Sequence, residues 1–254
     1  MSVVKKSKIK NLGIVGNMYK NFSKVYDKFM ENCSYDDWAQ FLKNIISDCK
    51  LQGKKILDLG CGTGEILLRM DGYNCSGLDL SSEMLKKANI KLKGKNIPLF
   101  LGDMREFNTG EKYGIIFSFF DTLNHLTSNE DLLDTFNSVK TSLDDGGIYI
   151  FDVVDREFMN KMFSNGVFAD VRKDFSMIWE HEVEEETGLD IIEATYFIKN
   201  KNKTYDRFSE VYEKKIFTKE EIEVACDLSG LSIEKIIIDE SLAGKRYFYI
   251  LKNN

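Results

Sequence analysis

Residues 56–65, ILDLGCGTGE, lead from an apolar, strand-like run directly into three alternating glycines. A helix-forming run from Glu65 to Met70 follows the last glycine. A strand that ends in glycines and opens a helix forms a backbone crevice at the carboxyl end of a parallel sheet, where open α/β folds bind ligands. Glycine suits such a turn because a residue without Cβ accepts a positive φ and lets a ligand approach the backbone.

The spacing of these glycines separates two classes of nucleotide-binding protein. It is G-x-G-x-G and not the G-x-G-x-x-G of nicotinamide-binding folds, and Asp58 stands two residues before the first glycine. Asp79 ends the next strand-like run, at the position where an acid accepts hydrogen bonds from a ribose diol. The loop taken alone is also compatible with a tight turn in some other α/β domain.

Three segments together resemble the class I S-adenosylmethionine-dependent methyltransferases of the small-molecule type: 58–64, Gly-Leu-Asp-Leu-Ser at 77–81, and Gly-Asp-Met at 102–104. The resemblance implies S-adenosylmethionine as cofactor, with Asp79 at the ribose hydroxyls and Asp103 at the adenine amino group. The cofactor-binding residues that it implies are Tyr26, Trp38, Asp58, Gly60, Cys61, Gly62, Gly64, Asp79, Leu80, Met84, Gly102, Asp103, Met104, Phe119 and Phe120.

Aromatic residues recur at helical spacing in 19–31 and again in 34–51, which predicts two amphipathic helices. Val25-Tyr26-Asp27 and Tyr35-Asp36-Asp37-Trp38 look like the N-terminal helices of glycine N-methyltransferase and of bacterial amino-sugar N-methyltransferases. In that family the matching Tyr and Trp approach the methionine end of the cofactor. Plain packing against the sheet is the alternative for both residues.

From Lys54 onward, strand and helix patterns alternate, as is typical of a parallel, doubly wound sheet. The predicted fold is a Rossmann-like, seven-stranded class I methyltransferase sheet with helices on both faces, plus an antiparallel β insertion after the fifth strand. The strands are expected at 54–59, 73–79, 97–101, 113–119, 147–153, 232–239 and 246–252, with insertion strands at 175–185, 189–199 and 204–217. Helices are expected at 64–71, 81–93, 128–142 and 219–229.

This pattern predicts one core domain with additions. Residues 1–17 are expected to form a flexible extension, and 18–51 to form lid helices over the cofactor. The cofactor-binding core comprises 52–165 and 218–254. The inserted meander, 166–217, is expected to cap the acceptor site or to form a dimer surface.

Composition narrows the function further. The net charge of −6 comes without a basic stripe, which disfavours nucleic acid as the substrate. No apolar run approaches the ~20 residues of a membrane span, so no membrane association is expected. Five cysteines without a C-x-x-C pair, and only two histidines, predict no metal site and a reduced, cytoplasmic protein. We expect a monomer or a homodimer.

The segment after the fourth strand borders the place where the methyl group would lie. His125 within it resembles a histidine at the same place in the amino-sugar N-methyltransferases, and is a candidate proton acceptor or a structural residue. Trp179, Tyr196 and Arg207 of the meander are expected to form the far wall of the acceptor site, because an insertion after the fifth strand leaves from the same sheet edge.

The favoured function is methyl transfer to a small-molecule acceptor, at an amino nitrogen, by in-line displacement. A small-molecule O-methyltransferase, an RNA or protein methyltransferase, and a non-catalytic cofactor-binding subunit remain alternatives. A nicotinamide dehydrogenase is disfavoured by the glycine spacing.

Overall fold

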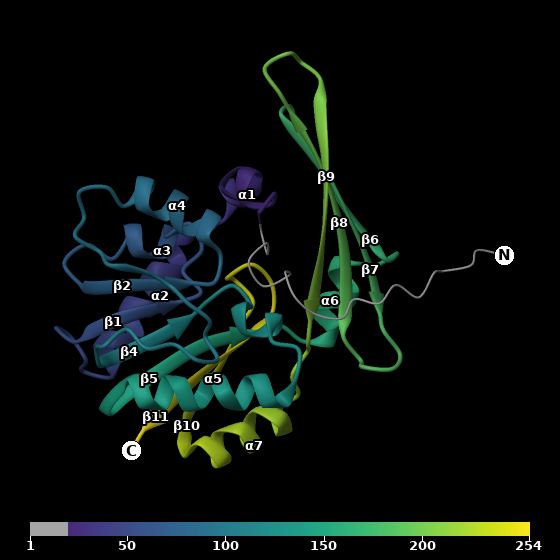
Figure 1. Cartoon of the computed structure of the whole chain (residues 1–254). Helices are drawn as coiled ribbons and strands as arrows, with labels where there is room; N and C mark the ends of the chain where they lie inside the picture. Colours follow the sequence, from purple (N-terminus) through teal and green to yellow (C-terminus); the bar gives the residue numbers. More distant parts are fainter. Residues whose placement is uncertain (1–19) are drawn as a thin grey trace.

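The computed structural model describes residues 20–254, so the extension predicted at 1–17 lies outside the described residues. Figure 1 shows a core sheet layered between helices and a second, taller sheet at its side. No helix within the described range is both long enough and apolar enough to cross a membrane.

The core sheet has seven strands in the order β10-β11-β5-β4-β1-β2-β3. Strands β3, β2, β1, β4 and β5 run parallel, whereas β11 runs antiparallel between β5 and β10. This confirms the predicted fold class. The bounds are β1 Lys55–Leu59, β2 Asn74–Asp79, β3 Leu99–Leu101, β4 Tyr113–Ser118, β5 Leu143–Val153, β10 Leu231–Asp239 and β11 Arg246–Asn253.

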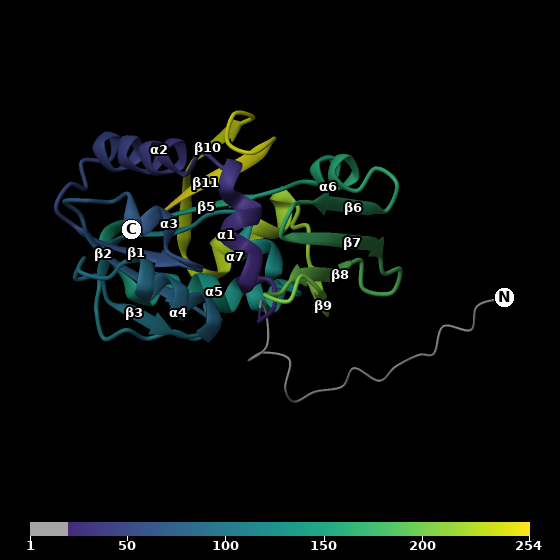
Figure 2. The same cartoon turned by 90° about the horizontal axis from the view of Figure 1, so that it is seen from above.

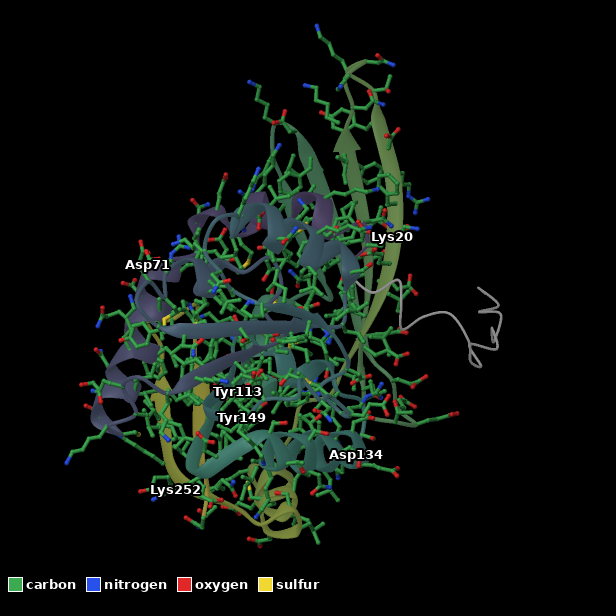
Figure 3. All side chains as sticks on the ribbon, turned by 60° about the vertical axis from the view of Figure 1, so that its left-hand side comes forward. Lys20, Asp71, Tyr113, Asp134, Tyr149 and Lys252 are labelled. Carbon is green, nitrogen blue, oxygen red and sulfur yellow. The ribbon has the colours of Figure 1, made fainter. Side chains whose placement is uncertain are left out.

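Helices cover both faces of this sheet, so its central strands are apolar on both sides. In β4, Ile115 and Phe117 pack toward α2, α3 and α4, and Ile116 between them packs toward α5 and α7. Figure 3 shows Tyr113 and Tyr149 inside this core. The helices are α2 Tyr35–Asp48, α3 Glu65–Leu68, α4 Ser82–Lys91, α5 Asn129–Ser142 and α7 Lys219–Ser229.

Side-chain caps fix where two of these helices begin. The Ser128 hydroxyl accepts a hydrogen bond from the Asp131 amide at 3.0 Å, which satisfies a free amide in the first turn of α5. Thr218 and Glu221 form a reciprocal capping box at the start of α7. Both starts agree with the sequence prediction.

The insertion is a four-stranded antiparallel sheet in the order β6-β7-β8-β9, and the prediction of three strands was incomplete. The strand that was missed, β6, is short, contains Ala169 and Asp170, and pairs with β7 only. Ala and Asp are poor strand formers, so the sequence pattern there is weak. Helix α6, Arg156–Met162, precedes β6 and was also not predicted. The bounds are β6 Val167–Val171, β7 Phe175–Val183, β8 Asp190–Lys199 and β9 Tyr205–Lys214.

Helix α1, Ser23–Phe29, lies between the core and the insertion, as Figure 2 shows from above. It ends earlier than predicted and continues as a 3-10 turn, Met30–Asn32. The Phe22 ring stacks on Tyr196 with centroids 5.4 Å apart, and the Glu210 carboxylate accepts the Asn21 amide at 2.6 Å. These contacts join the start of α1 to the insertion.

Candidate active site

A cavity of about 930 Å³ opens at the carboxyl ends of β1, β2, β3 and β4. Helix α1 and the 3-10 turn Thr122–His125 also contribute to its walls. Most of the predicted cofactor-binding residues meet here, together with His125. Those that line the cavity are Tyr26, Asp58, Gly60, Cys61, Gly62, Asp79, Leu80, Met84, Gly102, Asp103, Met104, Phe119 and Phe120.

Two predicted cofactor residues lie off the cavity wall. Trp38 is 1% exposed, and its ring stacks on Phe120 with centroids 4.0 Å apart, so it supports a lining residue from behind. Gly64 is the N-cap of α3 at φ 79°, and a Cβ there would lie 3.0 Å from Leu92. Both positions therefore serve packing, which was the alternative considered for Trp38.

The three residues expected to form the far acceptor wall also lie away from the cavity. Trp179 and Tyr196 are buried beneath α1, where the Tyr196 hydroxyl hydrogen-bonds Tyr212 at 3.0 Å. Arg207 is exposed on β9. The insertion contributes Glu213 of β9 to the lining instead. The reason is that α1 occupies the inner face of the insertion, between these aromatic residues and the core.

The glycine loop shapes the floor of the cavity. Gly60 has φ 95°, and a Cβ added there would lie 2.4 Å from the Thr122 side chain. Gly62 has φ 53° and faces open space, with nothing within 4 Å of a Cβ position. Gly60 thus allows the glycine loop to approach the turn that carries Thr122, and Gly62 leaves room for a ligand beside the backbone.

Asp79 organises the loop from the neighbouring strand. Its carboxylate accepts hydrogen bonds from the Gly62 amide and from the Ser81 amide, each at 2.8 Å. Burial raises the pKa of Asp79, and these two amides partly offset the rise. Burial, and then the charge of Asp79, raise the pKa of Asp58 well above its usual range. Asp79 therefore ties the glycine loop to the end of β2 while its carboxylate borders the cavity.

Arg105 borders the cavity beside Asp103, and the sequence reading did not single it out. Its guanidinium donates to Asp103 Oδ2 at 2.6 Å and to Asp131 Oδ1 at 2.8 Å. Burial would raise the pKa of Asp103, but the hydrogen bonds from Arg105 outweigh it and the pKa is lowered. Asp103 is therefore a carboxylate with further acceptor capacity, since each oxygen carries two lone pairs. Arg105 directly follows the Gly-Asp-Met segment at 102–104, and this position was the sequence signal that could have identified it.

Tyr35 is a second lining residue that sequence reasoning missed, although it opens the quoted segment Tyr35-Asp36-Asp37-Trp38. Its hydroxyl is buried and makes no hydrogen bond within residues 20–254. Burial raises the pKa of both Tyr26 and Tyr35, so both phenols remain protonated donors. A buried hydroxyl without a partner costs about 1–3 kcal/mol, which a bound polar ligand would recover.

These features fit an adenosyl cofactor. The open backbone at Gly62, the acceptor Asp79 and the unpartnered Tyr35 hydroxyl offer complementary contacts to a polar, partly charged ligand. The cavity is also large enough, since small-molecule sites commonly measure about 300–1,000 Å³.

The loop after β4 is held in a strained conformation. Phe120 and Asp121 have φ values of 63° and 50°, and each such non-glycine residue costs about 1–3 kcal/mol. The Asp121 backbone amide donates a hydrogen bond to Asp152 Oδ2 at 3.0 Å, and the Asp121 carboxylate accepts from Arg246 at 3.1 Å and from Lys214. This buried ionic network presents Phe120 to the cavity.

His125 lines the cavity as a neutral imidazole. Burial, reinforced by the charge of Lys214, lowers its pKa from 6.5 to about 3, and Asp121 opposes this only partly. A general base works best with a pKa near the working pH. The structure therefore gives His125 the position of a proton acceptor but a low basicity.

The cavity lining is rich in acidic side chains, several of which are ion-paired: Arg105 pairs with Asp103 and Asp131, and Lys91 pairs with Glu65. Among residues 20–254, Arg105 is the only arginine or lysine in this lining, whereas six acidic side chains contribute to it. These are Asp58, Glu65, Asp79, Asp103, Asp131 and Glu213. A cavity of this composition suits cationic ligands over anionic ones.

Comparisons with known proteins agree with this geometry. The profile of a family described as "Methyltransferase domain" matches residues 56–147. YqeM of Bacillus subtilis (strain 168), a protein named as a methyltransferase, is 34% identical over 226 residues, which cover 87% of this chain and 90% of YqeM. A Streptomyces venezuelae protein named dTDP-3-amino-3,4,6-trideoxy-alpha-D-glucopyranose N,N-dimethyltransferase is 29% identical, covering 83% of this chain and 90% of that one.

Solved structures show the same relationship. The crystal structure of an S-adenosylmethionine-dependent methyltransferase from Clostridium acetobutylicum ATCC 824 superposes with a TM-score of 0.80 at 25% identity. The match covers 92% of this chain and 98% of that one, so it includes the insertion as well as the core sheet. Together with the glycine loop and the cavity beside it, these findings show that the chain belongs to the S-adenosylmethionine-dependent methyltransferases, and that it is an enzyme of this family.

Proposed function

We propose that the enzyme methylates an amino nitrogen of a small molecule. The observation that carries the proposal is the excess of acidic side chains around the cavity, where Arg105 is the one Arg or Lys that the described part of the chain contributes to the lining. An amine arrives mainly as an ammonium ion, and acidic side chains around the cavity attract this cationic group. The names of three relatives, at 26–29% identity, also denote N,N-dimethyltransferases acting on amino sugars.

The residues of this chain would act by position and by exclusion of water. When bound, S-adenosylmethionine supplies an electrophilic methyl group on a sulfonium centre. Asp79, which already accepts the Gly62 amide, would also accept the ribose hydroxyls, and Tyr35 would donate its buried hydroxyl to a polar group of the ligand. Tyr26 and Phe120 wall off the methyl position, where aligned reactants gain most from fixed geometry.

Matched pairs of acceptors test this proposal. Primary amines and the alcohols that replace the amine by a hydroxyl are incubated with ¹³C-methyl-labelled S-adenosylmethionine, including amino sugars in free and nucleotide-linked form. We expect at least about tenfold higher kcat/KM for the amine of a pair, with the label on nitrogen. Transfer of the label mainly to oxygen in every productive pair would contradict an amine acceptor and leave the methyltransferase assignment intact.

The depressed pKa of His125 predicts a specific pH dependence. His125 stays neutral throughout pH 5–9 because its pKa lies at about 3, so kcat/KM has no inflection from His125 near pH 6.5. The lower limb of the profile instead follows deprotonation of the acceptor amine itself. We expect His125→Asn to lower kcat less than about tenfold and to leave the profile unchanged. A limb near pH 6.5 that disappears in this variant would assign His125 as the general base.

The same pKa shift affects stability. Because the pKa of His125 is about 3 in the folded state and about 6.5 in the unfolded state, the unfolded state binds the proton first as the pH falls. The contribution of His125 to stability is therefore complete above pH 6.5 and is lost as the pH falls toward 3. Urea unfolding of the wild type between pH 7 and 4 should therefore show a falling free energy of unfolding. The decline should be shallower in His125→Asn.

We also propose that the helices α1 and α2 form a lid over the cofactor. The Asp27 carboxylate of α1 accepts hydrogen bonds from Thr63 of the glycine loop at 2.7 Å and from Lys91 of α4 at 3.0 Å. Tyr26 beside it lines the cavity. These contacts hold α1 across the cavity opening, and lids of this kind close on microsecond to millisecond timescales.

Hydrogen exchange tests the lid. Adding S-adenosylhomocysteine should slow amide exchange in 22–51, and Asp27→Ala should speed it in the ligand-free protein because the tie to the glycine loop is lost. Asp36→Ala is the matched control, since the Asp36 side chain is 84% exposed and pairs with Arg69 and not with the glycine loop. Equal exchange with and without ligand would mean that these helices are permanent packing elements.

A further inference from the structure

Within the described chain, Glu213 is the one residue of the insertion that lines the cavity. It is the second-last residue of β9, whose carboxyl end packs against the 3-10 turn that carries His125. The Asn124 side-chain amide donates to the Lys215 carbonyl at 2.7 Å, and the Lys215 amide donates to the Asn124 carbonyl at 2.9 Å. The Asn124 side chain also accepts from the Val154 amide at 3.2 Å, just after β5. These bonds hold the strand end that carries Glu213 firmly beside the turn.

The two lysines that follow Glu213 in the sequence have other partners. Lys214 bonds the Asp121 carboxylate, and Lys215 pairs with Glu221 at 2.9 Å. The Glu213 side chain is exposed, and it forms no hydrogen bond or ion pair with any other side chain among residues 20–254. Its negative charge is therefore not taken up by a neighbouring cation of the described chain.

The other five acidic side chains of the lining are each accounted for. Asp79 accepts the Gly62 and Ser81 amides. Burial and the charge of Asp79 raise the pKa of Asp58 well above its usual range, which favours its uncharged form. The remaining three form ion pairs with Lys91 or Arg105, and they are Glu65, Asp103 and Asp131. Glu213 is thus the acidic side chain of the lining whose charge is left for a ligand.

We infer that Glu213 selects the acceptor by pairing with the ammonium group that the acceptor carries as it enters the cavity. This inference rests on the amine acceptor proposed above. A carboxylate attracts an ammonium ion and repels an anionic group, so Glu213 favours cationic acceptors. Because Glu213 is exposed to solvent, the ammonium proton passes to water before the neutral nitrogen attacks the methyl group. Glu213 therefore acts on acceptor binding and not on the transfer itself.

Sinefungin tests this placement without knowledge of the acceptor. It is an analogue of S-adenosylmethionine with a protonated amine in place of the methyl-bearing sulfonium, whereas S-adenosylhomocysteine has a neutral sulfur there. Calorimetric titration gives the dissociation constants of both ligands for the wild type, for Glu213→Gln and for the control Glu186→Gln. The control makes the same chemical change at an exposed position between β7 and β8, outside the cavity lining.

We expect Glu213→Gln to raise the dissociation constant of sinefungin at least about threefold relative to that of S-adenosylhomocysteine, the size expected for an exposed ion pair. The affinity for S-adenosylhomocysteine should stay nearly unchanged, and Glu186→Gln should bind both ligands as the wild type does. An unchanged ratio of the two constants in the folded Glu213→Gln protein, or an equal weakening of both ligands, would overturn the inference. Either result would leave the proposed amine acceptor standing, because the acceptor pairs test it separately.

Steady-state kinetics with an amine that is productive in those acceptor pairs give a second readout. Glu213→Gln should raise the KM of the amine about three- to tenfold and change kcat by less than about twofold, as for the loss of a binding contact. The rise should be largest below the pKa of the free amine, where the acceptor is mainly an ammonium ion, and should fade above it. A purely structural role would lower activity by the same factor at every pH.

An unchanged KM below the pKa of the amine would overturn the role of Glu213 while the amine itself remains the acceptor. Productive alcohols without any productive amine would refute the proposed function. They would also refute the recognition of an ammonium group by Glu213, even if the selectivity for sinefungin had fallen.

Discussion

Replacing Asp79 with alanine is expected to weaken S-adenosylhomocysteine binding by about 100-fold. The change leaves the ribose hydroxyls without their acceptor, at about 1–3 kcal/mol for each lost partner, and about 1.4 kcal/mol equals one factor of ten. It also removes the acceptor of two backbone hydrogen bonds, which the Gly62 and Ser81 amides donate to Asp79 at 2.8 Å each. Both effects act on the same step, the binding of the cofactor.

Calorimetric titration measures this loss. Asp79→Asn keeps one acceptor oxygen and should fall between the wild type and alanine. Asp71→Ala is the control, because Asp71 lies at the periphery of the core in Figure 3 and pairs with Lys95 through a side chain that is 82% exposed. NAD should bind the wild type poorly because the glycine spacing differs from that of dinucleotide folds. Unchanged affinity in a folded Asp79→Ala protein would remove Asp79 from the cofactor site.

Arg246→Met is expected to lower the free energy of unfolding by about 3–5 kcal/mol, because it leaves buried carboxylates without their cation. The Arg246 side chain is 5% exposed and bonds the fully buried Asp152 as well as Asp121. Burial would raise the pKa of Asp121, but the positive charges of Lys214 and Arg246 outweigh it and lower the pKa to about 2. The same network holds the strained backbone at Phe120 and Asp121.

Urea denaturation with Lys245→Met as the neighbouring control tests this expectation. Lys245 is one-third exposed, and its ion pairs with Asp155 and Glu157 lie at the surface, where solvent screening leaves them little effect on stability. Arg246→Met should also reduce turnover because the loop that carries Phe120 loses its support. A loss of unfolding free energy below about 1 kcal/mol would show that the network contributes little to the fold.

The core of the fold was predictable because its signals are local. The glycine loop at 58–64, the acid that ends β2 and the capping box at Thr218 are each fixed by a few adjacent residues. Strands that are buried on both faces, such as β4, are recognisable in the sequence as continuous apolar runs. These signals placed the sheet, the cavity at its carboxyl edge and most of the residues that line it.

The insertion was harder to predict because its contacts are distant in sequence. Nothing near Trp179 or Tyr196 reveals that Phe22, more than 150 residues earlier, covers their rings. The exposure of Arg207 likewise depends on which face of β9 turns outward. The sequence left Trp38 open between a cofactor contact and plain packing, and in the structure its ring stacks on Phe120 with centroids 4.0 Å apart. Whether a residue lines a cavity or backs the lining residue depends on tertiary packing that helical spacing does not encode.

A crystal structure of the enzyme with S-adenosylhomocysteine is the most direct test of whether this cavity is the site of methyl transfer. We expect the ligand in the cavity between the glycine loop and α1, with both ribose hydroxyls within about 3 Å of the Asp79 carboxylate. The sulfur should face Tyr26, Phe120 and His125, where the acceptor amine would approach. Density for the ligand elsewhere, or a ribose that does not contact Asp79, would contradict the assignment of this cavity as the site of methyl transfer.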